Sequence, residues 1–332
     1  MTHITLAHGN GGHYMRQLIE ESFAAQLANP VLDASADAAT LPALDGELLM
    51  TVDGFTVQPL EFPGGNIGSL AVHGTVNDLA VSGAVPKYLS LSAIIEEGLE
   101  LEQLQRLIES MAQAAQQADV YIVCGDTKVV PRGEGSGIYL TTTGIGVRNK
   151  SISLGLHHIR NGDCILVSGS VGDHGTAIML AREQFGLRGD IQSDSASVFP
   201  LCEALTDLPG LRFMRDPTRG GLATVLHEIH HATSLGVRVE QSNIPVKEPV
   251  TAVCDMLGYD PMYLACEGRV VAVIDKAHAQ RALECWRQLP QGENAQIIGH
   301  VNNGVARVVL ETDIGGERVL EELEDDPLPR IC

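Results

Sequence analysis

The chain of 332 residues ends in a cysteine, and this thiol offers the most direct chemistry in the sequence. Cys332 follows Pro327 and Pro329, which cannot continue a helix or donate hydrogen bonds within a central strand. Because the thiolate is a strong nucleophile near neutral pH, a thiol on an extended tail is suited to carrying a covalently bound group into a cleft and out again. An ordinary frayed terminus is the alternative. A prenylation signal is excluded, because it places the cysteine fourth from the end.

Three aspartates accompany apolar or small-residue segments in the first half of the chain. Asp53 ends an expected strand at 48–53, Asp78 lies among small residues, and Asp126 follows an expected strand at 120–124. Magnesium prefers oxygen ligands and usually binds through a few carboxylates together with substrate phosphates. We therefore expect Asp53, Asp78 and Asp126 to hold Mg²⁺ with a nucleotide, although caps and turn residues are the alternative for each of them.

A glycine-rich loop near the N-terminus could surround a phosphate with backbone N–H groups. It consists of Gly9, Asn10, Gly11 and Gly12 after His8. The loop matches neither the Walker A pattern nor the dinucleotide-binding fingerprint, so a mobile glycine turn is an equal alternative. Lys128, two residues after Asp126, could neutralise phosphate charge.

The second half of the chain contains three further candidate segments. Asp173 and His174 open an expected helix whose N-terminus could bind an anion, with a simple N-cap as the alternative for Asp173. Asp216 lies in the segment 215–221, which combines two arginines, a hydroxyl and two glycines. This composition suits phosphate or carboxylate recognition, or else a salt-bridged helix start. Glu267 stands on a turn before an apolar strand, where a carboxylate could act as a base.

Composition excludes several classes of protein. The formal net charge is −20, which argues against nucleic acid and anionic membranes as partners. The chain has seven cysteines, and none are spaced as Cys-x-x-Cys, so a zinc site or a redox dithiol of that type is not indicated, and the cysteines before Cys332 are expected to be reduced. We find neither a signal peptide nor an apolar run long enough to cross a membrane, and we expect a cytoplasmic protein.

Periodicity predicts two domains, at 1–150 and 151–321, followed by a tail at 322–332. The first domain is expected to begin with an extended piece at 3–12 and an amphipathic helix, and to contain a loop at 29–46. Further helices are expected at 68–82, 101–118, 174–185, 195–206, 220–235, 248–257 and 276–288. Further strands are expected at 89–96, 138–147, 163–169, 237–240, 269–275, 296–301 and 305–311.

Taken together, these motifs resemble the HypE family of hydrogenase maturation factors. This family belongs to a superfamily with aminoimidazole ribonucleotide synthetase and selenophosphate synthetase. The matching segments cover nearly the whole chain and lie at 8–12, 62–68, 77–84, 125–129, 172–175, 215–221, 267–268 and 329–332. The Pro-Arg-Ile-Cys ending is specific to HypE. One departure is Gly54, which stands after Asp53 where the resemblance leads us to expect a hydroxyl residue.

The resemblance implies an α+β fold of two mixed domains, with the first domain forming a homodimer interface through its sheet. It implies ATP and Mg²⁺ as cofactors. It also implies HypF as the donor of a carbamoyl group to Cys332, and the HypC–HypD complex as acceptor of the cyanide made from it for a nickel–iron hydrogenase. The nucleotide-binding residues that it implies are Gly9, Asn10, Gly11, Gly12, Asp53, Asn77, Asp78, Asp126, Thr127, Asp173, His174 and Asp216.

The same resemblance gives roles to two further residues. After ATP phosphorylates the amide oxygen of the thiocarboxamide, loss of phosphate leaves a thiocyanate. Lys128 would stabilise charge on the transferred phosphoryl group, and Glu267 would remove the amide protons.

Three rival functions stay open at this point. A selenophosphate synthetase needs a cysteine or selenocysteine in the first glycine-rich loop, and residues 8–12 contain neither. An enzyme of purine synthesis needs no reactive terminal thiol. A non-catalytic nucleotide-binding scaffold would not couple ATP hydrolysis to a carbamoyl group on Cys332.

Overall fold

The computed structural model describes residues 2–182, 189–304 and 306–324, so Cys332 lies outside the described residues. The chain divides into two compact units. Among the described residues, the first comprises those up to Leu79 and the segment Ala84–Arg148, and the second comprises Ala80–Gly83 and the chain from 149 to 324.

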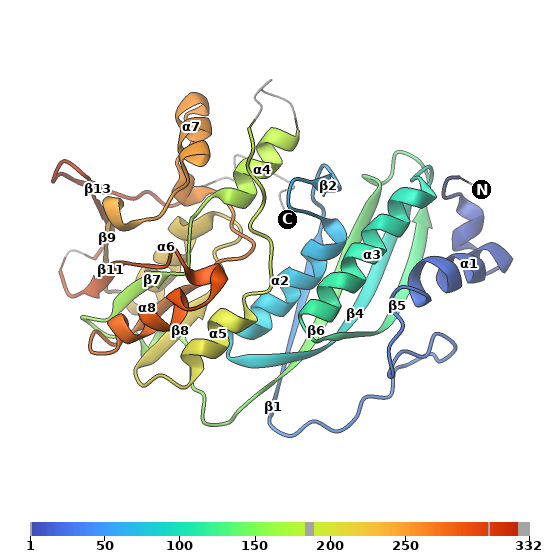
Figure 1. Cartoon of the computed structure of the whole chain (residues 1–332), viewed down its shortest axis with the longest axis horizontal. Coiled ribbons are helices and arrows are strands. Elements are labelled where there is room, and N and C mark those ends of the chain that lie inside the picture. The colour runs from blue at the N-terminus through green and yellow to red at the C-terminus, as the bar shows by residue number, and fades with distance from the viewer. Residues whose placement is uncertain (1, 183–188, 305, 325–332) are drawn as a thin grey trace. The chain divides into compact units, whose positions relative to one another are not determined.

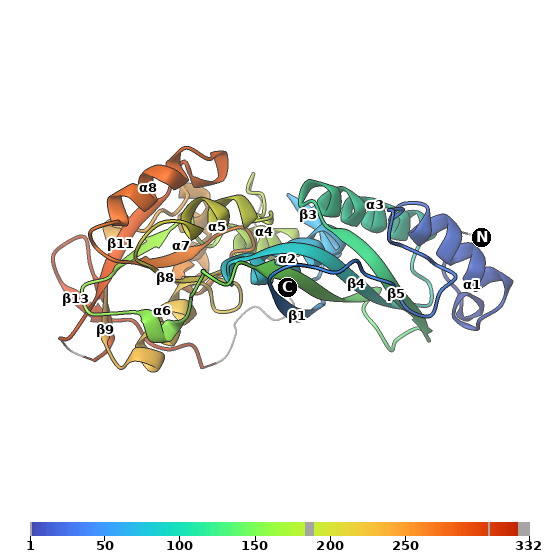
Figure 2. The ribbon, with the colours of Figure 1, turned by 90° about the horizontal axis from the view of Figure 1, so that it is seen from below.

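The first unit is built on a mixed sheet with strand order β1-β6-β4-β5. Its strands are β1 (Glu47–Phe55), β4 (Ala84–Glu96), β5 (Tyr121–Val130) and β6 (Ile138–Arg148). β4 and β5 run parallel and are connected by α3 (Leu101–Gln117), whereas the other pairs are antiparallel. Helices α2 (Ile67–Val81) and α3 cover one face of this sheet (Figures 1 and 2).

The other face of this sheet carries exposed apolar side chains. Along β1, the exposed residues alternate with partly buried ones, as expected for a strand with one covered face. The exposed members are large, since Leu48 is 62%, Met50 73% and Val52 60% exposed. Leu48 and Met50 are paired with Val147 and Ile145 of β6, so the apolar row continues on the neighbouring strand.

The N-terminal segment differs from the expected extended piece. Residues Leu6–Gly9 form a short 3-10 helix, in which the backbone N–H of His8 donates to the carbonyl oxygen of Thr5 at 2.9 Å and closes the turn. The backbone N–H of Thr5 in turn donates to Nδ1 of His8 at 3.0 Å. The expected amphipathic helix follows as α1 (His13–Leu18) and continues as a π-helix over Ile19–Ala24. A short hairpin, β2 (Glu61–Phe62) and β3 (Gly65–Asn66), precedes α2.

The second unit contains a larger mixed sheet with strand order β13-β12-β9-β11-β7-β10-β8. Its strands are β7 (Cys164–Val167), β8 (Leu211–Arg215), β9 (Gly236–Glu240), β10 (Val271–Ile274), β11 (Gln296–Asn302), β12 (Val308–Glu311) and β13 (Glu317–Val319). Its helices are α4 (Asp173–Ala181), α5 (Phe199–Thr206), α6 (Gly221–Thr233), α7 (Glu248–Leu257) and α8 (Ala279–Arg287). β8 and β13 were not expected from the sequence.

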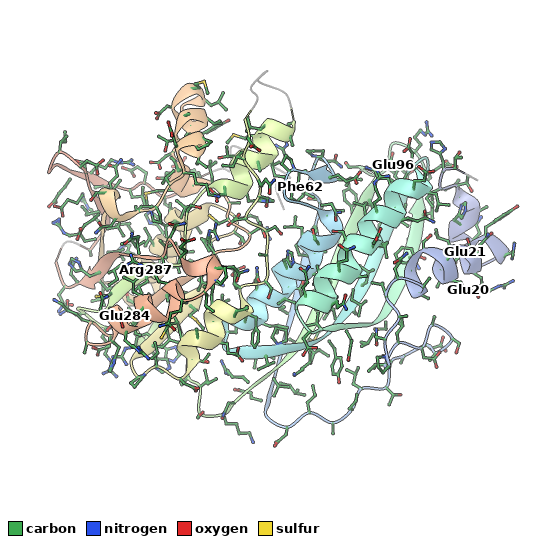
Figure 3. The ribbon with its side chains drawn as sticks, viewed as in Figure 1. Glu20, Glu21, Phe62, Glu96, Glu284 and Arg287 are labelled. Atoms are coloured by element: carbon green, nitrogen blue, oxygen red, sulfur yellow. The ribbon has the colours of Figure 1, made fainter. Side chains whose placement is uncertain are left out.

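Both faces of this second sheet are buried. Alternate residues of the central strands enter two separate cores, one against α6 and the other against α5 and α8. Trp286 of α8 is fully buried in the second of these cores, and its Nε1 donates to the carbonyl oxygen of Leu201 at 2.9 Å. Glu284 and Arg287 occupy the exposed side of α8 (Figure 3), so this helix is amphipathic as its periodicity predicts.

The cysteines of the described residues are all free, which confirms the expectation for them. Burial raises the pKa of the Cys202 and Cys266 thiols well above the ordinary value and raises that of Cys254 to about 12. These three are therefore poor nucleophiles at neutral pH. No helix in the described part of the chain is long and apolar enough to span a membrane.

Candidate functional site

Two of the expected metal-binding aspartates lie on neighbouring elements of the first unit. Asp78 belongs to α2, and its Oδ2 accepts a hydrogen bond of 2.7 Å from Oγ1 of Thr51 on β1. Asp53, two residues beyond Thr51, has its side chain on the same face of the strand. The expectation that Asp53 ends its strand is wrong, because β1 continues to the buried Phe55, which pairs with Leu140.

Asp126 lies elsewhere in the same sheet. The expectation that it follows a strand is also wrong, because β5 extends to Val130 and Asp126 pairs with Ser92 of β4. β1 and β5 are the two edge strands, so three strand spacings of ~4.8 Å, or roughly 14 Å, separate them. Within one chain, Asp126 therefore does not share an ion with Asp53.

The glycine-rich loop packs beside β5. A side chain at Gly9 would place its Cβ 3.0 Å from Cβ of Val129, and Gly11 has a φ of +74°. Small residues are thus required for the loop to approach the strand that carries Lys128. The Nζ atom of Lys128 lies 2.6 Å from Oδ2 of Asp126, and both side chains are more than half exposed. The ammonium group of Lys128 and the carboxylate of Asp126 are therefore both accessible to a ligand.

A buried hydroxyl and a small cavity adjoin this part of β5. Oγ1 of Thr127 is buried and has no hydrogen-bond partner among the described residues. A cavity of about 160 Å³ reaches Asp126 and Thr127, with Asp33 and Asp37 among its other lining residues. A buried donor of this kind requires a partner, which a polar ligand or water would supply.

The second unit holds Asp173 in a charged network. Asp173 is the first residue of α4 after Gly172, which is the N-cap, so the N-cap alternative for Asp173 is wrong. Its fully buried Oδ2 accepts from Oγ of Ser170 at 2.6 Å and lies 2.6 Å from Nζ of Lys247 and 3.4 Å from Nη2 of Arg269. Its Oδ1 is buried without a hydrogen-bond partner among the described residues.

Glu267 is held by a turn that packs against a polar segment. The backbone N–H groups of Glu267 and Gly268 each donate to the carboxylate of Asp194 at 3.2 Å. Glu267 itself is only 2% exposed. His174, also buried, has its Nδ1 2.8 Å from Oγ of Ser193, next to Asp194 in sequence. The segment around Ser193 therefore links the α4 N-terminus to the Glu267 turn.

The arginine-rich loop approaches the same turn. Gly221 has a φ of +58°, and a Cβ there would lie 2.5 Å from the carbonyl oxygen of Leu264, so only glycine allows this close approach. The backbone N–H of Cys266 donates to the carbonyl oxygen of Pro217 at 3.0 Å, next to the buried Asp216. Arg215 instead pairs with Glu228 at 3.0 Å, as the salt-bridge alternative anticipated.

The second unit thus places Asp173 and His174 at the start of α4, and Asp216 and Glu267 in two loops that contact each other. Sequence reasoning missed Asp194, Lys247 and Arg269, which organise these loops. Arg269 stands two residues after Glu267 and offered a signal through its charge. Asp194 and Lys247 lie in segments without a recognisable pattern, so only the fold reveals their contacts.

Comparisons with known proteins place both units in one family. Residues 35–148 match the N-terminal domain, and residues 160–311 the C-terminal domain, of AIR synthase related proteins. Carbamoyl dehydratase HypE of Azotobacter vinelandii is 47% identical over 331 residues, which cover 99% of this chain and 97% of the relative.

Solved structures agree with this assignment. A structure of hydrogenase maturation protein HypE in complex with ATP has a TM-score of 0.94 and 44% identity, covering 98% of this chain and 99% of that chain. A structure of a HypE–HypF complex has a TM-score of 0.81 and 43% identity, covering 92% of this chain and 99% of that chain. The chain therefore belongs to the HypE family, the carbamoyl dehydratases of hydrogenase maturation.

Proposed function

We propose that this protein dehydrates a carbamoyl group carried on its own Cys332, at the expense of ATP, and supplies the product as the cyanide ligand of a nickel–iron hydrogenase. The observation that carries the proposal is the combination of a full-length match to carbamoyl dehydratases with a chain that ends in Pro-Arg-Ile-Cys. The buried thiols of the second unit are poorly suited to this role, because burial raises their pKa.

The chemistry requires an oxygen to leave an amide carbon. Transfer of the γ-phosphoryl group of ATP to the carbamoyl oxygen converts it into a leaving group, and ADP is released. Breakage of the C–O bond then releases phosphate, while the nitrogen loses its two protons over the two steps, and the S–C≡N group stays on Cys332. Lys128 would stabilise the phosphoryl group, and the buried Glu267 would accept protons.

The donor set of the first unit fits Mg²⁺. Carboxylate oxygens at Asp53, Asp78 and Asp126 are the ligands that this ion prefers, and the ion would neutralise phosphate charge. The buried atoms Thr127 Oγ1 and Asp173 Oδ1, which lack partners among the described residues, support a polar ligand in each unit. Asn77, which is buried beside Asp78, and the loop at 9–12 would contribute to nucleotide binding.

A second copy of the chain would complete the magnesium site. Asp53 and Asp126 lie on opposite edge strands, so a partner whose β5 lies against β1 would bring its own Asp126 toward Asp53 and Asp78. The apolar row of Leu48, Met50 and Val52 supports this arrangement, because burying it against another copy removes it from water. We therefore propose a homodimer through the first unit, with nucleotide near the interface.

Two partners would act before and after the dehydration. The relative in the HypE–HypF structure is bound to HypF, which supports HypF as the source of the carbamoyl group. The HypC–HypD complex would accept the cyanide. The net charge of −20 argues against nucleic acid and anionic membranes as partners, and we propose that the protein acts in the cytoplasm.

Intact mass spectrometry tests the proposal. The purified protein is incubated with HypF, carbamoyl phosphate and ATP, and the C-terminal peptide is then mapped. We expect one carbamoyl group on Cys332, followed by loss of one water only with hydrolysable ATP and Mg²⁺. A tail that stays unmodified beside an active partner would contradict the proposal and favour a nucleotide-binding scaffold.

Two variants separate the steps of the reaction. Cys332→Ser should abolish stable carbamoylation, whereas the matched change Cys285→Ser should leave it intact. Glu267→Gln should accept the carbamoyl group normally but lose water at least ~100-fold more slowly, because a positioned base contributes about 10²–10⁴-fold. Full dehydration by this variant would remove Glu267 from its proposed role.

A further inference from the structure

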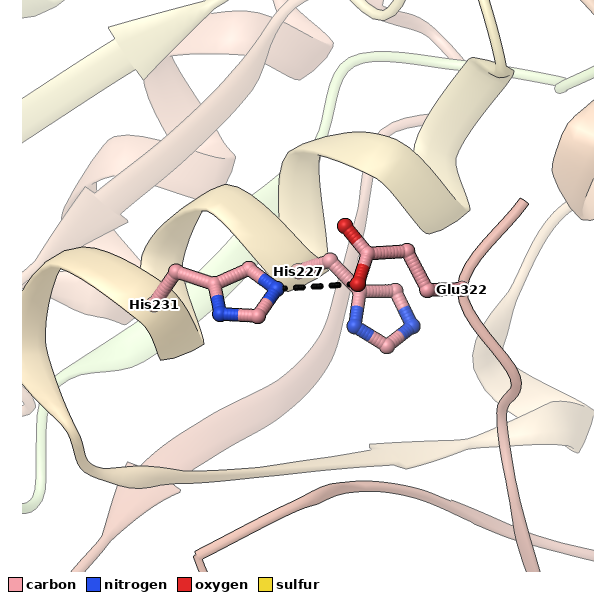
Figure 4. A group of neighbouring side chains, drawn as sticks. All are labelled: His227, His231 and Glu322. Atoms are coloured by element: carbon pink, nitrogen blue, oxygen red, sulfur yellow. Dashed lines mark hydrogen bonds and ion pairs between the residues drawn. The ribbon is translucent and has the colours of Figure 1, made fainter. Parts of the chain in front are cut away.

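Three side chains of types that bind metal ions come together in the second unit, and none of them belongs to the candidate site described above. His227 and His231 lie on α6, and Glu322 lies beyond β13 (Figure 4). One ligand atom from each of the three residues lies within 4.8 Å of the others. His227 is buried, whereas His231 and Glu322 are more than half exposed, so the group is accessible from one side.

The helix places both histidines on one face. Residues four positions apart in an α-helix are neighbours on its surface, and α6 is regular from Gly221 to Thr233. The opposite face is fixed in the core by Leu222, Leu226 and Ile229. Two imidazoles at this spacing are a frequent zinc-binding arrangement, and a carboxylate from another segment commonly completes it.

The hydrogen bonding of His227 prepares it as a ligand. Its Nε2 lies 3.1 Å from the carbonyl oxygen of Leu320. Because a carbonyl oxygen only accepts, Nε2 must carry the proton in this bond, which leaves the lone pair on Nδ1. Histidines that bind metals usually donate their other N–H to a carbonyl or carboxylate in this way.

The other two ligands are already at a suitable separation. Nε2 of His231 lies 3.1 Å from Oε2 of Glu322. Two ligands at ~2.0 Å from a tetrahedral zinc ion stand about 3.3 Å apart, so this pair needs little movement to share an ion. The net charge of −20 also favours the approach of a cation.

The arrangement favours a structural site over a peptidase site. The sequence His227-Glu228-x-x-His231 matches the zinc-peptidase pattern, in which the glutamate acts as the base. Here Glu228 is paired with Arg215 at 3.0 Å, so its carboxylate is engaged on another side of the helix. A metal ion at this position would instead connect α6 to the chain segment that contains Glu322.

We propose that His227, His231 and Glu322 bind one divalent transition-metal ion, of the class that prefers imidazole and carboxylate ligands, such as Zn²⁺. The ion would fasten Glu322 to α6, extending an attachment already made by the buried Leu320 and by Tyr263, whose hydroxyl donates to the carbonyl oxygen of Glu321 at 2.7 Å. Glu322 lies ten residues before Cys332, so the ion would fix the point from which the tail reaches, at most ~36 Å.

Zinc titration of the full-length, tag-free protein tests the proposal. We expect one Zn²⁺ per chain by calorimetry, with at least tenfold weaker binding in His231→Gln and in Glu322→Gln. Both side chains are exposed, so neither change should prevent folding. The controls Glu321→Gln and His13→Gln should bind as the wild type does. Equal binding by all variants, or no binding by the wild type, would overturn the proposal.

Cobalt substitution distinguishes this site from binding at a thiol. Co²⁺ should give absorption bands of a nitrogen and oxygen ligand set, without the charge-transfer band of a thiolate, and these should vanish in His231→Gln. A thiolate band would place the ion at a cysteine and contradict the proposal. Hydrogen exchange at residues 320–324 should slow with Zn²⁺ in the wild type and not in Glu322→Gln. This readout does not depend on ATP or on carbamoyl transfer, so it is separate from the proposed dehydration.

Discussion

The two units of the molecule use their sheets in different ways. In the second unit, neighbouring residues of β7 and β10 enter cores on opposite faces, so the sheet is covered by α6 on one side and by α5 and α8 on the other. In the first unit, α2 and α3 cover one face (Figure 2). Met50 and Val52 of β1 are exposed on the opposite face. An apolar face left bare in a folded unit is typical of a surface that meets a partner.

The charged side chains of the candidate site also differ between the two units. Asp173 of the second unit is fully buried and neutralised within its own unit by Lys247 and Arg269. Asp126 and Lys128 of the first unit are exposed on an edge strand. The charge of Asp173 is therefore balanced within the second unit, whereas the first unit has an open face and an open edge, which is what the proposed homodimer would cover.

Removing Trp286 should cause the largest loss of stability, because it opens the closed core of the second unit. Trp286→Ala should lower the free energy of unfolding by about 3–5 kcal/mol, from lost burial and the cavity left behind. Urea unfolding followed by circular dichroism measures this, since the variant lacks the chain's single tryptophan. Trp286→Phe should cost less, and a loss below about 1 kcal/mol for the alanine variant would contradict a closed core.

Charge on the bare face should break association without unfolding the chain. Met50→Glu combined with Val52→Glu should raise the dimer dissociation constant at least ~100-fold, or about 3 kcal/mol. Sedimentation at several concentrations measures this. Met256→Glu provides the matched control, because Met256 is 61% exposed on α7 of the second unit. A wild type that is monomeric throughout would rule out the proposed interface.

The sequence predicted elements whose signal is local. The helix expected at 101–118 and the strand expected at 138–147 match α3 and β6 within one residue at each end, because a strong amphipathic period marks the first and alternating residues the second. β8 was missed because Arg212 and Arg215 make its short sequence look like a loop. Arg212 is accommodated there by Asp163 and Asp275, at 3.5 and 3.1 Å.

The family was predictable from the sequence, but the positions of the candidate site residues in the fold were not. The resemblance to the HypE family was confirmed over the full length, and it correctly indicated a carbamoyl dehydratase. The Gly-Asp-Thr-Lys run at 125–128 reads as a turn, yet pairing with β4 keeps it in a strand. That Asp53 and Asp126 lie on opposite edges follows from strand order, which depends on contacts far apart in sequence. The individual ligand and catalytic roles stay predictions.

A buried histidine should make the first unit sensitive to acid. Burial lowers the pKa of His73 on α2 to about 4 from an ordinary value near 6.5. Between these values the unfolded chain binds a proton that the folded chain does not, so stability falls as the pH drops from 6.5 toward 4. The loss due to His73 should be roughly 2 kcal/mol between pH 7 and pH 4.5.

Comparison with a variant isolates this loss from the titration of carboxylates. Urea unfolding at the two pH values should show a smaller change for His73→Gln than for the wild type. Fluorescence of Trp286 reports the second unit at the same time, and its transition should be less affected by the substitution. An identical pH dependence in both proteins would show that His73 does not titrate with the lowered pKa.

The exposed pair on β5 should contribute least to folding. Lys128 and Asp126 are both more than half exposed, and such pairs typically stabilise a protein by at most about 1 kcal/mol. The free energy of unfolding of Lys128→Met should therefore lie within about 1 kcal/mol of the wild-type value. The variant should nevertheless dehydrate the carbamoyl group at least ~100-fold more slowly, because it removes the charge that we propose stabilises the transferred phosphoryl group. Lys87→Met, on the neighbouring strand, is the matched control, and mass spectrometry of the tail measures the rate. If Lys128→Met instead lost stability and kept its dehydration rate, Lys128 would serve the folding of the first unit. The exposed edge strand β5 would then not be part of the proposed active site.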